Sequence, residues 1–211
     1  MSVAPLLSLG DLDGAAARAF EARDLAQRVA FEPPLVSAGI DLLFIFARAR
    51  DPGRAESLFD ETARAVQKAS GWHAWKWNLR LSQARAELAS ARGAWPEAVR
   101  AATDAIDQSR LHHRAKYEAL GLATRARALH RLQSSDPAKD ARAAVDVARR
   151  LADPAVLLDS LTVLLEIEGS DPLLEEARKT AGAILAGLSQ PSLRSAFVHS
   201  VSQKRHHLLE S

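Results

Sequence analysis

The chain has 211 residues, enough for one domain or for one elongated array with a continuous core. Apolar residues make up 47% and charged residues 26%, so the chain is too apolar to be disordered, and its net charge of +2 lacks the clustered basic excess of nucleic-acid-binding proteins. No cysteine is present, which excludes disulfides, thiol nucleophiles and cysteine-ligated metals.

Nearly every segment reads as helix, because alanine and leucine dominate the apolar residues and no alternating apolar–polar run appears. At several of the short breaks, Asp or Ser precedes a proline or opens the next helix, as N-capping favours. In chain order the predicted breaks are residues 32–34, 51–53, 70–71, 92–93, 134–137, 153–154, 169–172 and 190–191. The pattern predicts an all-α chain of about ten to eleven helices without a sheet.

Five of the predicted helices carry a common pattern of small residues, which begins with an alanine after the opening turn. These alanines lie roughly forty residues apart, and the segment HAWKW (73–77) is echoed by HRAKY (113–117) at the same interval. A helix pair that recurs in this way is typical of an α-solenoid, a stack of antiparallel helix pairs. The alanines are Ala15, Ala55, Ala98, Ala141 and Ala177.

Three of the four tryptophans lie within the segment Gly71–Leu81. On a helix from residue 72 to 92, Trp72 and Trp75 lie on one apolar side and Trp77 lies on the nearly opposite side. A surface helix has one apolar stripe, whereas two stripes back to back suit a helix packed between its own partner and a neighbouring repeat. We therefore predict that the tryptophans are packing residues of the core.

A polar stripe runs between these two apolar sides, and an equivalent stripe follows one repeat later. In a solenoid, inner-helix side chains that escape both packing faces line the concave surface. We expect the stripes to form the floor of a binding groove, whose Lys and Arg residues face a protein or peptide partner of acidic character; the open alternative is a solvated surface without a partner. The candidates are His73, Lys76, Arg80, Gln83, Glu87, His113, Lys116, Arg127 and His130.

Helix pairs with a turn glycine (Gly10, Gly93) and a small anchor five residues later (Ala15, Ala98) resemble tetratricopeptide repeats. The interval exceeds the usual length of about thirty-four residues, so the chain is similar to the long-helix arrays of large bacterial signalling proteins, which accompany ATPase, cyclase, kinase or transcription-regulator modules. The resemblance covers residues 6–199 and implies a right-handed superhelix that binds proteins. The lysines and asparagines of the chaperone-tail clamp cannot be placed, so that activity is not implied.

We expect one domain over residues 1–211, with about five helix pairs and a C-terminal cap or tail over residues 200–211. The sequence opens in mid-pattern, which a short atypical cap or a longer parent protein would explain. Solenoid ends expose apolar surface unless a polar cap covers them, so homo-oligomerisation through an end is a further expectation.

The leading functional prediction is a non-catalytic scaffold that binds protein or peptide, as the regulatory or sensor arm of a signalling protein. No phosphate-binding glycine loop, HExxH helix or nucleophile–base arrangement appears, so we expect no enzyme and no cofactor. His206, His207 and Glu210 at the chain end are too few for a metal site. No signal peptide or membrane span is visible, which favours a cytoplasmic protein without nucleic-acid or membrane partners.

Two alternatives stay open. One is a sensor that binds a small effector or peptide inside the superhelix and acts through self-association. A deep pocket lined by Trp77, Tyr117 and the basic residues of the stripe would favour it. The other is an enzyme on a helical array, which would need a buried cluster of titratable groups.

Overall fold

The computed structural model describes residues 3–71, 73–134 and 136–204, with side chains described to residue 202. This part of the chain contains eleven helices and no strand, which confirms the predicted all-α fold. The helices are α1 (Val3–Leu9), α2 (Leu12–Arg28), α3 (Glu32–Arg48), α4 (Pro52–Lys68), α5 (Ala74–Ala91), α6 (Trp95–Leu111), α7 (Ala115–Arg131), α8 (Pro137–Leu151), α9 (Pro154–Ile167), α10 (Asp171–Gly187) and α11 (Pro191–Lys204).

Several helices begin at the caps that the sequence predicts. The side chains of Asp51, Asp136, Asp153 and Ser170 each accept a hydrogen bond from the backbone N–H three residues later, and a proline stands in the first turn of the helix that follows. These caps satisfy backbone donors that have no partner within the helix, so they fix where the helices start.

The turn inside each of the first four helix pairs contains a residue with left-handed backbone conformation. Gly10 after α1 and Gly93 after α5 have φ values of 78° and 72°, which glycine adopts without the steric cost that a Cβ brings. The equivalent turns after α3 and α7 place Arg50 and Gln133 at φ values of 55° and 53°. The turn geometry is therefore repeated even where the glycine is not.

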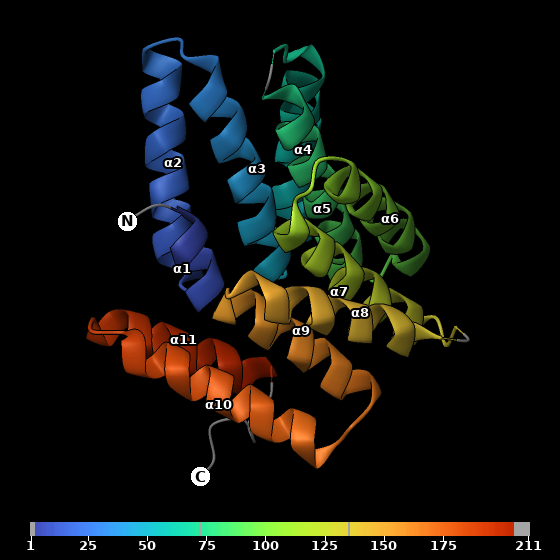
Figure 1. Cartoon of the computed structure of the whole chain (residues 1–211). Coiled ribbons are helices and arrows are strands. Elements are labelled where there is room, and N and C mark those ends of the chain that lie inside the picture. Colours follow the sequence, from blue (N-terminus) through green and yellow to red (C-terminus); the bar gives the residue numbers. More distant parts are fainter. Residues whose placement is uncertain (1–2, 72, 135, 205–211) are drawn as a thin grey trace.

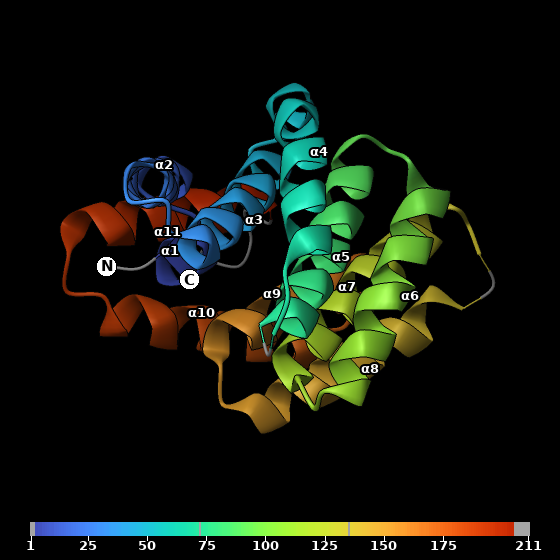
Figure 2. The same ribbon diagram turned by 90° about the horizontal axis from the view of Figure 1, so that it is seen from above.

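The helices form two rows, as Figures 1 and 2 show. Along the inner row, α3, α5, α7 and α9 pack directly on one another, and outside it α4, α6 and α8 each contact the two inner helices next to them. This arrangement is the predicted α-solenoid of stacked helix pairs.

The repeated alanines lie where the outer helices meet the inner row. All five have 0% exposed surface, and they occupy α2, α4, α6, α8 and α10 in turn. A small side chain allows two helix backbones to approach closely, so the alanine sets the spacing of each pair. The equivalence of these five positions is confirmed.

Helix α5 is buried on two opposite sides, as predicted. Trp77, 7% exposed, and Leu88 belong to a core cluster that is centred on α3, whereas Ala86 and Ala89 pack with alanines of α6 and α7. Trp77 is therefore a packing residue of the core. Trp72 lies outside the described residues, and Trp75 is treated below with the candidate site.

Helix α11 closes the superhelix against α1 (Figure 1). Leu193 of α11 belongs to the same core cluster as the leucines of α1, and Phe197 belongs to the cluster of α9. At the end of α1, a Cβ on Gly10 would lie only 2.3 Å from the Cβ of Ser200. The first and the last described helices thus hold each other in place. The assignment of residues 1–211 to one domain with a cap at 200–211 stays a prediction, because residues 205–211 lie outside the described part.

We expect Gly10→Ala to lower the free energy of unfolding by more than about 1 kcal/mol, because alanine at φ 78° is strained and its Cβ would collide with Ser200. The control is Gly182→Ala in α10, where a Cβ meets no atom within 4 Å and alanine favours the helix by up to about 1 kcal/mol. Urea denaturation followed by circular dichroism measures both. Equal stability of the two variants would contradict the closing contact.

Candidate functional site

Arg80 of α5, the third residue of the predicted binding stripe, is buried. Its side chain is 11% exposed and donates hydrogen bonds to Asp41 Oδ1 of α3 at 2.5 Å and to Ser37 Oγ at 2.9 Å. Burial raises the pKa of Asp41, and the charge and hydrogen bond of Arg80 offset only part of that rise. Arg80 therefore fastens α5 to α3.

Glu87, two turns further along α5, is held by Arg48 of α3. Arg48 Nε and Nη2 donate to the two carboxylate oxygens at 2.9 and 3.3 Å, and Nη1 donates to the carbonyl oxygen of Leu7 at 3.4 Å. Burial acts to lower the pKa of Arg48, but the negative charges of Glu87 and Asp159 outweigh it and hold the pKa above its ordinary value. One guanidinium thus links α1, α3 and α5.

Gln83 lies between these two ion pairs and is fully buried. Its Nε2 donates to Thr124 Oγ1 of α7 at 3.1 Å and to Glu87 Oε1 at 3.2 Å. The stripe of α5 therefore bonds to α3 on one side and to α7 on the other. The expectation that Arg80, Gln83 and Glu87 line an open concave surface is corrected, because the neighbouring inner helices stand close enough to bond all three.

The stripe of α7 continues the same arrangement toward α9. Lys116 Nζ lies 2.8 Å from Asp153 Oδ2, and Arg127 Nε lies 3.1 Å from Glu166 Oε2. These two cations keep 46% and 37% of their side chains exposed. We call the bonded pairs along the inner row the polar ladder: Asp41–Arg80, Arg48–Glu87, Gln83–Thr124, Lys116–Asp153 and Arg127–Glu166.

The other stripe residues lie at helix ends. His73 precedes α5, and its ring stacks on Trp77 at a centroid distance of 5.3 Å. Lys76 is exposed in the first turn of α5, His113 is exposed in the turn between α6 and α7 with φ 52°, and His130 is exposed in the last turn of α7. A binding role of the stripe stays a prediction, and its exposed members can carry it.

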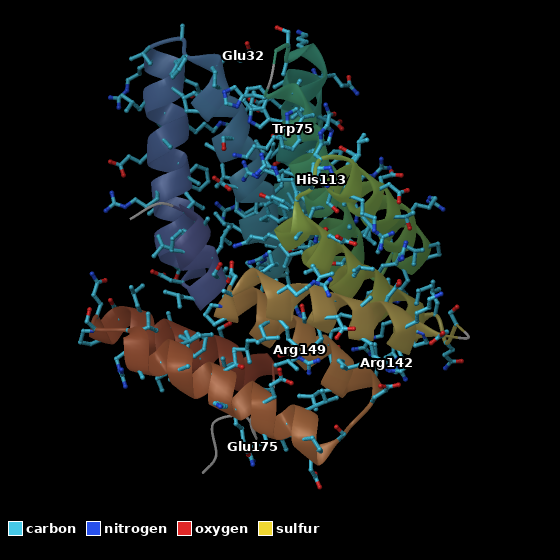
Figure 3. All side chains as sticks on the ribbon, viewed as in Figure 1. Glu32, Trp75, His113, Arg142, Arg149 and Glu175 are labelled. Atoms are coloured by element: carbon cyan, nitrogen blue, oxygen red, sulfur yellow. The ribbon has the colours of Figure 1, made fainter. Side chains whose placement is uncertain are left out.

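The sequence predicts Trp75 as a core residue, but in the structure Trp75 is only partly buried. The ring stacks on His112 at 4.3 Å with an interplanar angle of 22°, and the guanidinium of Arg114 lies 4.9 Å from its centroid. His112 and Arg114 belong to the turn that precedes α7, so the contact joins successive repeats. Figure 3 labels Trp75 and, in that turn, His113. We call Trp75, Lys76, His112 and Arg114 the Trp75 cluster.

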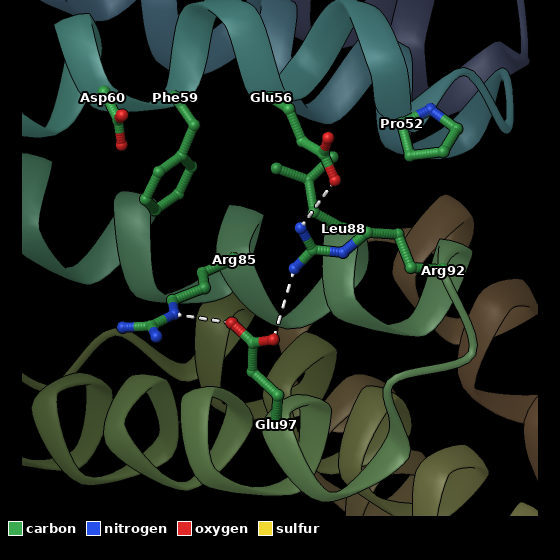
Figure 4. Close-up of a pocket in the computed structure, with 8 residues that line it drawn as sticks. All are labelled: Pro52, Glu56, Phe59, Asp60, Arg85, Leu88, Arg92 and Glu97. Carbon is green, nitrogen blue, oxygen red and sulfur yellow. Dashed lines mark hydrogen bonds and ion pairs between the residues drawn. The ribbon is translucent and has the colours of Figure 1, made fainter.

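A cleft of about 300 Å³ lies on the outer side of α5, between α4 and α6 (Figure 4). Phe59 and Leu88 form its apolar part. Arg92 crosses the cleft and binds Glu56 of α4 at 3.1 Å and Glu97 of α6 at 3.3 Å. Trp77 and Tyr117 do not line this cleft, so it is not the effector pocket that the sensor alternative expected.

Among the residues that the structure describes, no group of three His, Asp or Glu side chains is arranged to hold a metal ion. The terminal set of His206, His207 and Glu210 lies outside that part of the chain. Between residues 3 and 204, no helix combines the length and the apolar character that crossing a bilayer requires.

No family model matches the chain, and no curated protein matches it. The chain is similar in structure to the crystal structure of BtubC (BKLC) from P. vanneervenii, with a TM-score of 0.57 and 18% sequence identity. The match covers 94% of this chain and 88% of that chain. At this level of identity the similarity concerns the helical fold alone, and it supports a helical-repeat architecture over nearly the whole chain.

We expect Arg80→Met to lower the free energy of unfolding by about 3–5 kcal/mol, because it leaves a buried carboxylate without its cation. Adding Asp41→Leu should recover most of that loss, since replacing both members of a buried ion pair by apolar residues is often neutral or better. Arg149→Met is the control, because Arg149 pairs with Glu176 at a more exposed site. Urea denaturation of the four proteins tests this, and a double variant as unstable as Arg80→Met would contradict the role assigned to the pair.

The Lys116–Asp153 pair predicts a pH dependence. Burial alone would raise the pKa of Asp153, but the hydrogen bond and charge of Lys116 outweigh it and set this pKa below its ordinary value. A lowered carboxyl pKa stabilises the fold above the unfolded-state value, and the stabilisation is lost as the pH falls through the folded-state value.

We therefore expect the stability difference between wild type and Lys116→Met to be constant from about pH 7 to about pH 5 and to shrink below about pH 4. Urea midpoints measured at several pH values test this expectation. A difference that does not change down to about pH 3 would contradict it.

Proposed function

We propose that this chain is a non-catalytic scaffold of the tetratricopeptide-repeat type that binds an acidic protein segment at the Trp75 cluster. The observation that carries the proposal is the partly exposed side chain of Trp75 on α5, which packs against His112 and Arg114 of the turn before α7. The fold supports a scaffold because successive repeats present side chains from different helix pairs along one surface.

Trp75 has the features of a binding anchor. Aromatic residues that are held in place lose little conformational freedom when a partner arrives, and tryptophan and arginine dominate the energetics of protein interfaces. The stack on His112 and the cation–π contact with Arg114 restrict the indole before binding. The cost of ordering the site is therefore small.

The surroundings of Trp75 favour negative charge on the partner. Lys76 and Arg114 are exposed, and neither forms a salt bridge with another described residue. Both lie at the N-terminal ends of α5 and α7, where unpaired backbone N–H groups add positive potential. An acidic segment with one apolar side chain for the indole would fit this surface. The charges of the polar ladder are paired within the chain, so the ladder contributes less to binding.

Selection of a displayed library of random peptides against the full chain tests the proposal. We expect the enriched sequences to be rich in Asp and Glu around an apolar residue, and their dissociation constants to rise with salt concentration. Trp75→Ala, and Lys76→Glu combined with Arg114→Glu, should each weaken the best peptide at least about tenfold.

The control is Arg100→Glu, which reverses an exposed charge on α6 without touching the Trp75 cluster. It should bind as wild type does, and circular dichroism should show that every variant keeps its helices. Enriched peptides that bind Trp75→Ala as tightly as wild type would place the site elsewhere, and a library that yields no enriched peptide would refute the scaffold function itself.

A further inference from the structure

The second half of α2 exposes a row of large apolar side chains. Leu25 is 54% exposed, Val29 at the end of the helix is 61% exposed, and Phe31 just beyond it is 56% exposed. Ala22, one turn before Leu25, is exposed as well. Contiguous apolar surface of this kind on a soluble protein usually marks an interaction site.

The position equivalent to Ala22 is buried in the outer helices α4, α6 and α8. Ala22 stands seven positions after the anchoring alanine, and the residues at that position in α4, α6 and α8 are Thr62, Ala105 and Ala148, with 4%, 0% and 1% exposed surface. In those pairs an inner helix of 17 or 18 residues covers the outer helix along its length, whereas α1 has 7 residues. Figure 1 shows α1 beside only the lower part of α2.

We infer that a second copy of this chain covers the exposed face, so that the two α2 helices pack antiparallel about a two-fold axis near Leu25. The uncovered position is one that an antiparallel helix fills in the other pairs, and a two-fold axis across α2 supplies a helix in that orientation. Leu25 of one copy then meets Leu25 of the other, with Val29 and Phe31 at the two ends of the contact.

Charge complementarity favours a copy of the chain over an unrelated helix. In an antiparallel pair centred between residues 24 and 25, Glu21 of each copy lies opposite Arg28 of the other, which gives two ion pairs that flank the leucines. Among the described residues, the salt bridge of Glu21 is with Arg18 at 2.8 Å, and the side chains of Glu21 and Arg18 are 66% and 56% exposed. Arg28 forms no salt bridge with another described residue. An exposed ion pair such as Glu21–Arg18 contributes little free energy, so Glu21 can exchange it for an ion pair with Arg28 of the second copy.

Sedimentation velocity of the full chain across concentrations from about 1 to about 300 μM tests this inference. The weight-average mass should rise from 22.8 kDa toward twice that value. Leu25→Lys should weaken the association at least about tenfold, because it places a charge at the centre of the contact. Leu111→Lys is the matched control, since Leu111 is 73% exposed on α6 and should leave the association unchanged.

A charge exchange tests the orientation. Glu21→Arg and Arg28→Glu should each weaken the association, and the variant with both substitutions should recover it, because the opposite charges face each other again. A wild-type mass that stays at 22.8 kDa across the range, or Leu25→Lys that associates as wild type does, would overturn the inference. Failure of both single charge variants to weaken the association would overturn the antiparallel arrangement. Peptide binding at the Trp75 cluster should be unchanged in Leu25→Lys, so the two proposals fail separately.

Discussion

Burial of each inner helix on two opposite sides is the constraint on which the rest of this structure depends. Helix α5 packs Trp77 and Leu88 toward α3, and Ala86 and Ala89 toward α6 and α7. A helix with two apolar sides has only a narrow polar strip between them, and its neighbours on the inner row stand on both sides of that strip. The packing of the inner helices against one another therefore determines which polar side chains can reach solvent.

The polar ladder follows from this geometry. Where two inner helices stand close, a charge on one of them must find a partner on the next, because an unpaired buried charge would cost several kcal/mol. Arg80 and Glu87 bond to α3, and Gln83 bonds to α7. Toward the ends of the helices the strip opens to solvent, at Lys76, at the turn before α7 and at His130 in the last turn of α7. This difference places the proposed binding surface at one edge of the inner row instead of along its middle.

Much of the fold could be predicted from the sequence, because its signals are local. Proline and capping residues fix the helix starts, and the small residues repeat with each pair, so the equivalence of Ala15, Ala98 and Ala141 follows from spacing alone. The pairing of Arg80 with Asp41 could not be predicted in the same way, since it joins residues on different repeats whose distance depends on how tightly the superhelix curves. The stacking of Trp75 on His112 also joins residues on different repeats, so it could not be predicted from local signals either. Likewise, only the structure shows that the short helix α1 packs along just part of α2 (Figure 1).

Amide hydrogen exchange of the native chain, at a concentration low enough to keep it monomeric, tests the central claim most directly. If α5 is held from two sides, its amides should open only with the whole molecule and exchange among the slowest. The amides of α10, which buries only Ala177 and Ala181, should exchange much faster. Exchange in the middle of α5 as fast as in α10 would contradict the account, because a helix held on two flanks cannot open by itself.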